Sequence, residues 1–458
     1  MGEFPLGRRG LTLGAIMPAD ENVAWRRSFQ MLPKEENELV TRVGPGTPMG
    51  ELMRKYWLPA LLSWELPSPD CPPIRLKLLG EQLVAFRDTN GNVGVIDEFC
   101  AHRRASLWLG RNEEGGLRCV FHGWKYDVTG QCVDQMNEPE SFKDKIKLAS
   151  YATSERGGVI WTYMGRGTPP PPPDFEYTRV SERHREVNRV WQESNWLQAL
   201  EGGLDTSHAP ILHRAMKAGA GITMDTAFVR GGAPSLEVDI TDYGYRYAGV
   251  RPLVEDQQYV RGYHFVMPFT QIRPSQNAGR GQERTVISGH HWVPIDDENC
   301  MVWNWDYSYG SEELSESERG GGGNGGGNGP QYVDYANEFR AKGNPRNNWL
   351  IDREMQRTVN FTGIRGINAQ DRAVQESMGP IVDRSLEHLG PADKAIIAMR
   401  RLMLEAIKVV EDGGTPRGVA ASYYDLRAYE KVLPRTLPWR DVLDPEMYQK
   451  GATASRLT

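Results

Sequence analysis

The order of hydrophobic and polar residues divides the chain into two parts at about residue 165. Before that point, short apolar runs such as IRLKLLG, QLVAFRD and GGVIWTYMG are separated by turn residues. Asn90 and Gly91 lie between two such runs and are typical of a hairpin turn, because both residue types adopt left-handed backbone angles readily. The pattern from about 56 to 165 therefore predicts a small antiparallel β domain.

The part after residue 165 mixes strand and helix patterns. The segments SLEVDITDYGYRYAGVR and YHFVMPF are typical of strands. The segment PADKAIIAMRRLMLEAIKVVEDGG starts at Pro391, has apolar residues at helical spacing and ends in glycines, so it predicts a long helix. The stiff run TPPPPPDF at 168–175 predicts a domain boundary. The glycine-rich segment 317–330 cannot pack a core and predicts a mobile surface loop.

Composition narrows the class of protein. A chain of 458 residues is too long for one compact core, and a net charge of −6 with 25% charged residues is ordinary for a folded protein without a nucleic-acid-binding surface. No apolar run is long enough for a membrane helix. Five scattered cysteines argue against a disulfide framework and for a reducing, cytoplasmic location. Residues 1–30 carry little pattern, so translation starts either at Met1, with a disordered extension, or at Met31.

Two short segments each supply one cysteine and one histidine. Cys100 and His102 are followed, after a long spacer, by Cys119 and His122. Zinc is one candidate for four such ligands, but zinc fingers usually present both cysteines before both histidines. A two-iron cluster whose irons differ explains the mixed pairs, since one iron would bind both thiolates and the other both imidazoles.

A second group of candidate ligands lies in the segment ESNWLQALEGGLDTSHAPILHRAM. Glu201, Asp205 and His208 have the spacing of one helical face. Pro210 is expected to break this helix, which would let His213 return to the side of His208. Two histidines and one carboxylate would form the facial triad of non-haem Fe(II), with open positions for O₂. Glu201 is the local candidate for that carboxylate.

Together, the spacing C-x-H-x16-C-x2-H before G-W-x-Y and the pattern N-W-x4-E-x3-D-x2-H-x4-H resemble the Rieske non-haem iron oxygenases over residues 31–450. The resemblance implies an α+β fold with a [2Fe–2S] Rieske domain at 56–165. It also implies a mononuclear iron domain at 166–458, with an antiparallel sheet packed by helices in the helix-grip or START-like manner. Residues 1–55 would be an extension and a helical segment packing on the catalytic domain.

In this family the third iron ligand is a distant aspartate. The segment NAQDRAVQESMGPIVDRSLEHL matches that region, so the resemblance implies the iron ligands His208, His213 and Asp371, with the local glutamate outside the ligand set. It further implies that Asp205 is catalytic and links His208 to His122 of a neighbouring subunit. Electrons would then cross between subunits of a homotrimer or hexamer. The alternative for Asp205 is that it only stabilises its helix.

Several segments, among them NELVTRVGPGTPMGELMRKYWLPALL, look most like the phthalate-dioxygenase type of this family. The resemblance implies an α-only enzyme that uses O₂ and an NAD(P)H-dependent reductase carrying FMN and [2Fe–2S]. It implies dioxygenation of a small aromatic substrate, a carboxylate such as a phthalate or phenoxybenzoate. The alternatives are a monooxygenase or O-demethylase of a methoxylated aromatic acid, and a non-catalytic Rieske electron carrier.

An anionic substrate needs a cation, and the planar fork of arginine suits a carboxylate. Arg251 and Arg261, at the ends of predicted strands, are candidates, although an ion-paired arginine is the alternative at both positions. The chain departs from the family at Ala101 and Arg104, where proline and glycine are usual. These departures affect the expected shape of the first cluster loop and the docking of the reductase.

Overall fold

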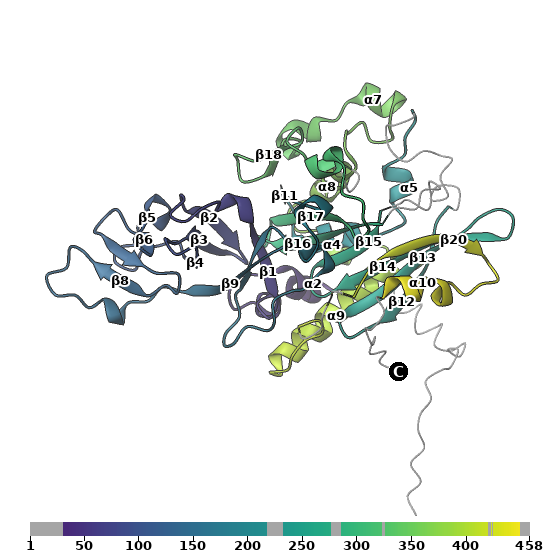
Figure 1. Ribbon diagram of the computed structural model, residues 1–458. Coiled ribbons are helices and arrows are strands. Elements are labelled where there is room, and N and C mark those ends of the chain that lie inside the picture. The colour runs from purple at the N-terminus through teal and green to yellow at the C-terminus, as the bar shows by residue number, and fades with distance from the viewer. Residues whose placement is uncertain are drawn as a thin grey trace, which may run out of the picture.

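The structure, a computed structural model, describes residues 31–217, 232–275, 285–322, 326–419, 423 and 425–448. Figure 1 shows a smaller β domain at one end and a larger domain, built on a wide sheet with helices, at the other. The predicted α+β fold is confirmed. The possible extension and alternative start of residues 1–30 lie outside the described residues, and the domain bounds at 55 and 165 stay a prediction.

The smaller domain contains two antiparallel sheets. Six strands in the order β1-β10-β9-β4-β3-β2 form one sheet, and β5-β6-β7-β8 form the other. Gly91 has φ 85° in the turn between β3 and β4, which agrees with the predicted hairpin. The strands are β1 (Trp57–Leu62), β2 (Ile74–Leu78), β3 (Glu81–Arg87), β4 (Val93–Asp97), β5 (Arg111–Glu113), β6 (Gly116–Arg118), β7 (Trp124–Tyr126), β8 (Cys132–Gln135), β9 (Ser150–Arg156) and β10 (Val159–Tyr163).

The larger domain is built on one ten-stranded sheet. Its order is β12-β13-β14-β15-β16-β17-β11-β19-β18, and β20 pairs with β14. The pair of β11 and β19 is parallel, so the sheet is mixed rather than wholly antiparallel as predicted. The strands are β11 (Arg185–Gln192), β12 (Ser235–Ile240), β13 (Gly244–Pro252), β14 (Gln257–Val266), β15 (Thr270–Pro274), β16 (Val286–Pro294), β17 (Cys300–Ser308), β18 (Val333–Asp334), β19 (Arg340–Ala341) and β20 (Tyr429–Pro434).

Helices cover the sheet and connect it to the N-terminal segment. Helix α4 packs on β15, β16 and β17, while α9 packs on β12 and β13 and also contacts α2 and α3. The predicted long helix is confirmed as α9, which buries its apolar face. The helices are α2 (Lys34–Thr41), α3 (Pro48–Met53), α4 (Trp196–Leu204), α5 (Ala209–Leu212), α7 (Arg353–Thr358), α8 (Ile367–Ser377), α9 (Lys394–Glu411) and α10 (Trp439–Met447).

The glycine-rich segment differs from its prediction. Its later residues are buried rather than on the surface, and Arg372 of α8 donates hydrogen bonds to the Gly327 carbonyl at 2.6 Å and to Asn328 Oδ1 at 3.1 Å. Gly327 has φ +100°, and a Cβ there would lie 2.9 Å from the backbone nitrogen of Ala369. Because glycine has no side chain, the backbone at Gly327 can approach α8 closely.

Two separate groups of buried side chains fill the smaller domain. One continues into the core of the larger domain, and the other lies under β6, β7 and β8. The second group includes Cys100, Cys119 and Cys132. Among the described residues, none of the helices combines the length and apolar character needed to cross a membrane.

Candidate metal centres

The two Cys–His pairs meet at the far end of the smaller domain. Cys100 and His102 follow β4, and Cys119 and His122 lie between β6 and β7. Both cysteines are buried, whereas both histidines are partly exposed. The imidazole ring centroids are 4.4 Å apart. Two turns, packed on a common core, thus bring two thiols and two imidazoles into one site.

The thiols of this site interact closely. The pKa of Cys100 is lowered to about 6, chiefly because the Cys119 thiol hydrogen-bonds to it, and the pKa of Cys119 is raised for the same reason. The Tyr126 hydroxyl lies 3.2 Å from Cys100 Sγ and accepts the Ala101 N–H. The readily formed thiolate is the form that binds metal.

The imidazole of His102 provides a direct test of fit to a metal. Its Nδ1 atom is buried and has no hydrogen-bond partner among the described residues. Its ring stacks on Trp124, with centroids 4.7 Å apart and planes 9° apart, which fixes its orientation. A buried nitrogen without a partner is costly unless something else binds it, and an iron of a cluster would do so.

Arg104 shows what the departure from the family pattern means for the loop. Its φ is 59°, a left-handed angle that glycine adopts without strain. Its guanidinium donates to Asp97 Oδ2 at 3.2 Å and lies over the ring of Phe99, 4.8 Å from the centroid. These contacts hold a loop shape that the residue itself does not favour.

The second centre joins the predicted residues of the larger domain. His208, His213 and Asp371 each offer one ligand atom within 4.8 Å of the others. Nε2 of His208 and Nε2 of His213 each lie 3.3 Å from Oδ1 of Asp371. That Oδ1 atom is buried without a hydrogen-bond partner among the described residues. The two-histidine, one-carboxylate set therefore fits a non-haem Fe(II) ion.

Each histidine of the triad makes a hydrogen bond through the ring nitrogen that faces away from the site. His208 Nδ1 donates to Asp205 Oδ2 at 3.1 Å, and His213 Nδ1 donates to Gln370 Oε1 at 2.8 Å. The Gln370 amide nitrogen donates to the carbonyl of Ile364, which fixes the direction of its side chain. Both rings thus present Nε2 to the site. Gln370 was missed by the sequence analysis, although it directly precedes Asp371.

The charges of the triad favour metal binding. Burial raises the pKa of Asp371, but His213 and His208 outweigh burial and hold it well below its usual range. Burial lowers the pKa of His208, while Asp205 and Asp371 raise it, with a net value of about 10. A cation placed among these groups would replace the proton on His208.

The local geometry differs from the predicted helical face. Helix α4 ends at Leu204, and Asp205 is extended at φ −66° and ψ 123°. His208 then caps α5, whose first turn contains Pro210. The prediction that proline breaks the helix was wrong, because a proline at the start of a helix needs no N–H partner. The short helix α5, with His208 at its N-cap and His213 at its C-cap, rather than a kink, brings the histidines together.

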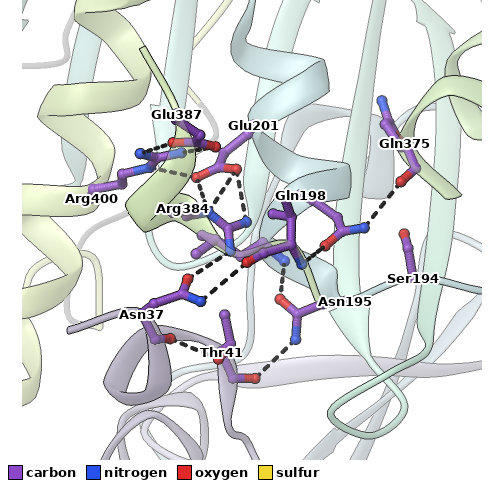
Figure 2. A network of polar contacts seen from close by, with 12 residues as sticks. Asn37, Thr41, Ser194, Asn195, Gln198, Glu201, Gln375, Arg384, Glu387 and Arg400 are labelled. Carbon is purple, nitrogen blue, oxygen red and sulfur yellow. Dashed lines mark hydrogen bonds and ion pairs between the residues drawn. The ribbon is translucent and has the colours of Figure 1, made fainter. Parts of the chain in front are cut away.

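Glu201 lies in a different site from the triad. It accepts hydrogen bonds from the buried Arg384 and Arg400, at 2.6–3.1 Å. Figure 2 shows this network, in which Arg384 also reaches Asn37 of α2 and Arg400 reaches Glu387. Glu201 therefore anchors α4 and is already bound by two guanidinium groups.

Arg251 and Arg261 lie on the same face of the sheet as each other, and both are buried. Arg251 donates to the Thr206 carbonyl at 2.6 Å, next to Asp205. Arg261 is 2.9 Å from Glu430 Oε2 and donates to the Pro274 carbonyl. Arg261 is thus ion-paired, as the alternative interpretation holds. Their role toward a substrate stays a prediction.

The two candidate centres lie at opposite ends of the folded molecule. Figure 1 shows the sheet of β5, β6 and β8 at one end and α5 near the other. The loop that carries Cys119 and His122 follows β6 of that sheet, and His208 and His213 of the triad flank α5. One chain therefore does not bring its own two centres together.

Comparison with known families agrees with this geometry. The family described as Rieske [2Fe-2S] domain matches residues 56–152, and the family described as LigXa C-terminal domain like matches residues 162–455. The second match alone covers more than half of the chain.

Three relatives match nearly the whole chain. It is 39% identical to the 3-chlorobenzoate-3,4-dioxygenase oxygenase subunit of Comamonas testosteroni, over 88% of this chain and 96% of that one. It is 36% identical to the phthalate 4,5-dioxygenase oxygenase subunit of Pseudomonas putida, over 90% and 94%. It is 30% identical to the 5,5'-dehydrodivanillate O-demethylase oxygenase subunit of Sphingobium sp. (strain NBRC 103272 / SYK-6), over 93% and 90%.

Proposed function

This chain belongs to the Rieske non-haem iron oxygenases as an alpha subunit, and from that premise we propose that it oxygenates an aromatic carboxylate, using O₂ and electrons from a reductase. The observation that carries the substrate class is the similarity over about nine-tenths of the chain to two oxygenase subunits whose named substrates are chlorobenzoate and phthalate. The favoured reaction is dioxygenation of the ring.

The candidate ligands would form two iron centres with different functions. Cys100, Cys119, His102 and His122 would hold the [2Fe–2S] cluster, and the triad of α5 and α8 would hold the mononuclear iron. When bound, the cluster supplies one-electron transfer and the mononuclear iron supplies O₂ binding and activation. Fixed ring orientations at both histidines of the triad keep Nε2 directed at the iron.

Asp205 has a further role in this proposal. Its Oδ2 accepts the His208 Nδ1–H, and its side chain remains partly exposed. Because the two centres of one chain lie at opposite ends, we propose that His122 of a neighbouring copy reaches Asp205, in a homotrimer or a hexamer. The electron donor would be a NAD(P)H-dependent reductase with FMN and [2Fe–2S].

A monooxygenase or O-demethylase reaction is the second candidate. The observation that favours it is the 30% identity to an O-demethylase subunit over 93% of this chain. The metal ligands do not separate these reactions, since all of them need the same two centres. A non-catalytic electron carrier is disfavoured, because the triad has a complete set of ligands.

Product analysis tests the proposal. The purified chain with a surrogate reductase, NADH and ¹⁸O₂ is offered a panel of benzoate, phthalate, phenoxybenzoate and methoxybenzoate acids. A product carrying two labelled oxygen atoms supports dioxygenation, whereas formaldehyde release from methoxybenzoates supports O-demethylation. Consumption of neither O₂ nor any acid by a chain with both iron centres loaded would contradict the proposed substrate class.

A further inference from the structure

The face of the large sheet that points toward α4 carries a polar row. We call this side the inner face, and Gln271 of β15 marks it by donating to the Gly203 carbonyl of α4 at 2.7 Å. A Cβ on Gly203 would lie 2.1 Å from the ring of Trp292, which is on β16 of the same face. The inner face is thus the side covered by α4.

Arg273 belongs to this inner face, two residues after Gln271 on β15. It pairs in register with Ser288 of β16, which pairs with Asp306 of β17. The Ser288 hydroxyl donates to Asp306 Oδ1 at 2.5 Å. Three neighbouring strands therefore align a guanidinium, a hydroxyl and a carboxylate in one row.

Residues of the inner face interact electrostatically with the triad. Arg273 interacts with Asp306 along the row and also with Asp371, the carboxylate of the triad. His290, which pairs with Gln271 across the strands, likewise interacts with Asp371. Arg273 is thus a cation whose charge acts on a candidate iron ligand, whereas the charge of Arg251 acts on Asp205.

We propose that Arg273 is the group that recognises the substrate carboxylate, and that Asp306 is its counter-ion, which takes up a proton when the substrate carboxylate takes its place. This inference rests on the proposed function and names the residue that selects acids within it. Arg273 is half-buried. A negative partner offsets the partial desolvation of its guanidinium, so Asp306 stabilises the site before substrate binds. The proton comes from solvent and ends on the Asp306 carboxylate.

The surroundings of Asp306 favour that exchange. Burial is the main reason that its pKa is raised to about 6, and Arg273 opposes that rise. Glu186 of β11 pairs with Asp306 across the strands, and burial and the charge of Asp306 raise the pKa of Glu186 to about 7. Glu318 acts on Asp306 with negative charge. Arg319 acts on Glu186. Once a substrate carboxylate binds Arg273, a second buried anion becomes unfavourable and Asp306 protonates.

The linkage predicts how affinity depends on pH. Asp306 must gain a proton when an acid binds, so affinity for the acid falls as pH rises above about 6, by at most about tenfold per pH unit. An uncharged amide of the same acid does not displace Asp306, and its affinity does not follow this slope. A merely structural ion pair would affect acid and amide alike.

Calorimetric binding with the iron-loaded protein tests the inference. The probes are phthalate, 3-chlorobenzoate and 3-chlorobenzamide, each measured at pH 6.0–8.0 in two buffers of different ionisation heat. The variants are Arg273→Gln, Arg273→Lys and Asp306→Asn, with Arg435→Gln as control because Arg435 is exposed on the surface. Circular dichroism and iron content show whether each variant is folded.

We expect Arg273→Gln to weaken acid binding roughly 30-fold or more, since it removes the cation that pairs with the substrate carboxylate, while amide binding stays unchanged. Asp306→Asn should remove both the proton uptake and the pH slope. The same Kd for acids in folded Arg273→Gln, or equal proton uptake in the wild type and Asp306→Asn, would overturn the inference. Wild-type protein that binds none of the acids would instead contradict the proposed function.

Discussion

The two histidines of the triad are supported by groups of different charge. A carboxylate, Asp205, accepts from His208, whereas a neutral amide, Gln370, accepts from His213. A carboxylate behind an imidazole raises its basicity, and an amide mainly orients it. The orientation of His213 therefore depends on the neutral side-chain amide of Gln370.

Replacing Gln370 tests this orienting role. Gln370→Ala should lower affinity for the mononuclear iron about 10- to 100-fold, because His213 loses the acceptor that fixes its ring. Gln370→Glu retains an acceptor and should keep most of the iron. Both variants should keep the [2Fe–2S] signal, which serves as the internal control. Equal iron affinity in Gln370→Ala and wild type would contradict the role.

Glu201 illustrates a residue whose role is structural. Burial raises its pKa, but Arg384 and Arg400 outweigh burial and lower it. A lowered pKa in the folded state means that stability is present above the ordinary carboxyl pKa and is lost as the pH falls.

The Glu201→Gln variant should unfold more easily, by about 3–5 kcal/mol, because two buried guanidinium groups lose their anion. Chemical unfolding at pH 7 measures the change. Glu354→Gln is the control, since its ion pair with Arg357 is exposed and should contribute little. If the two variants were equally stable, Glu201 would not anchor α4.

At the scale of single residues, the sequence was most informative about the Cys–His pairs, since short loops keep their ligands close in sequence. Asp371 came from family resemblance alone, because no spacing connects it to His213. The hydrogen bond from His213 to Gln370 joins positions 157 residues apart. Such a contact depends on how α8 docks, which local patterns do not contain.

At the scale of elements, strand and helix existence followed from hydrophobic pattern, as β13, β14 and α9 confirm. The connection between α4 and α5 could not be predicted from the hydrophobic pattern. Helical spacing at Glu201, Asp205 and His208 suggested one continuous face, but the helix ends at Leu204. The chain turns at Asp205, and both histidines then reach Asp371 of α8, so tertiary packing overrides local spacing.

The glycine-rich segment gives a second test at this scale. Gly327→Ala should lower stability by about 1–3 kcal/mol and loosen the mononuclear iron, because a Cβ would strain the backbone and press on α8. Thermal unfolding and iron content measure both effects. Gly320→Ala is the matched control, as its Cβ would meet nothing within 4 Å. Loss of neither stability nor iron in Gly327→Ala would show that the contact is unimportant.

At the scale of the whole molecule, the separation of the two centres has a testable consequence. If electrons pass between copies, a chain without a working cluster can be complemented by one without a working triad. His122→Ala and Asp371→Ala should each be inactive alone. Co-expressed in equal amounts and mixed at random, they should regain at most about a quarter of wild-type activity in a closed ring.

Complementation has a clear contrary outcome. Mixtures that stay inactive, although copies of the two variants with different affinity tags co-purify as mixed oligomers, would mean that electrons stay within one chain. Mixing the variants after each has been purified, without subunit exchange, is the control and should give no activity.

The central claim is that this chain holds two different iron centres, and metal analysis with electron paramagnetic resonance tests it most directly. Wild-type protein should contain about three irons per chain and, once reduced, show a Rieske-type signal. Asp371→Ala should contain about two irons and keep that signal. Zinc in place of iron at the Cys–His site, or three irons retained in Asp371→Ala, would contradict the account.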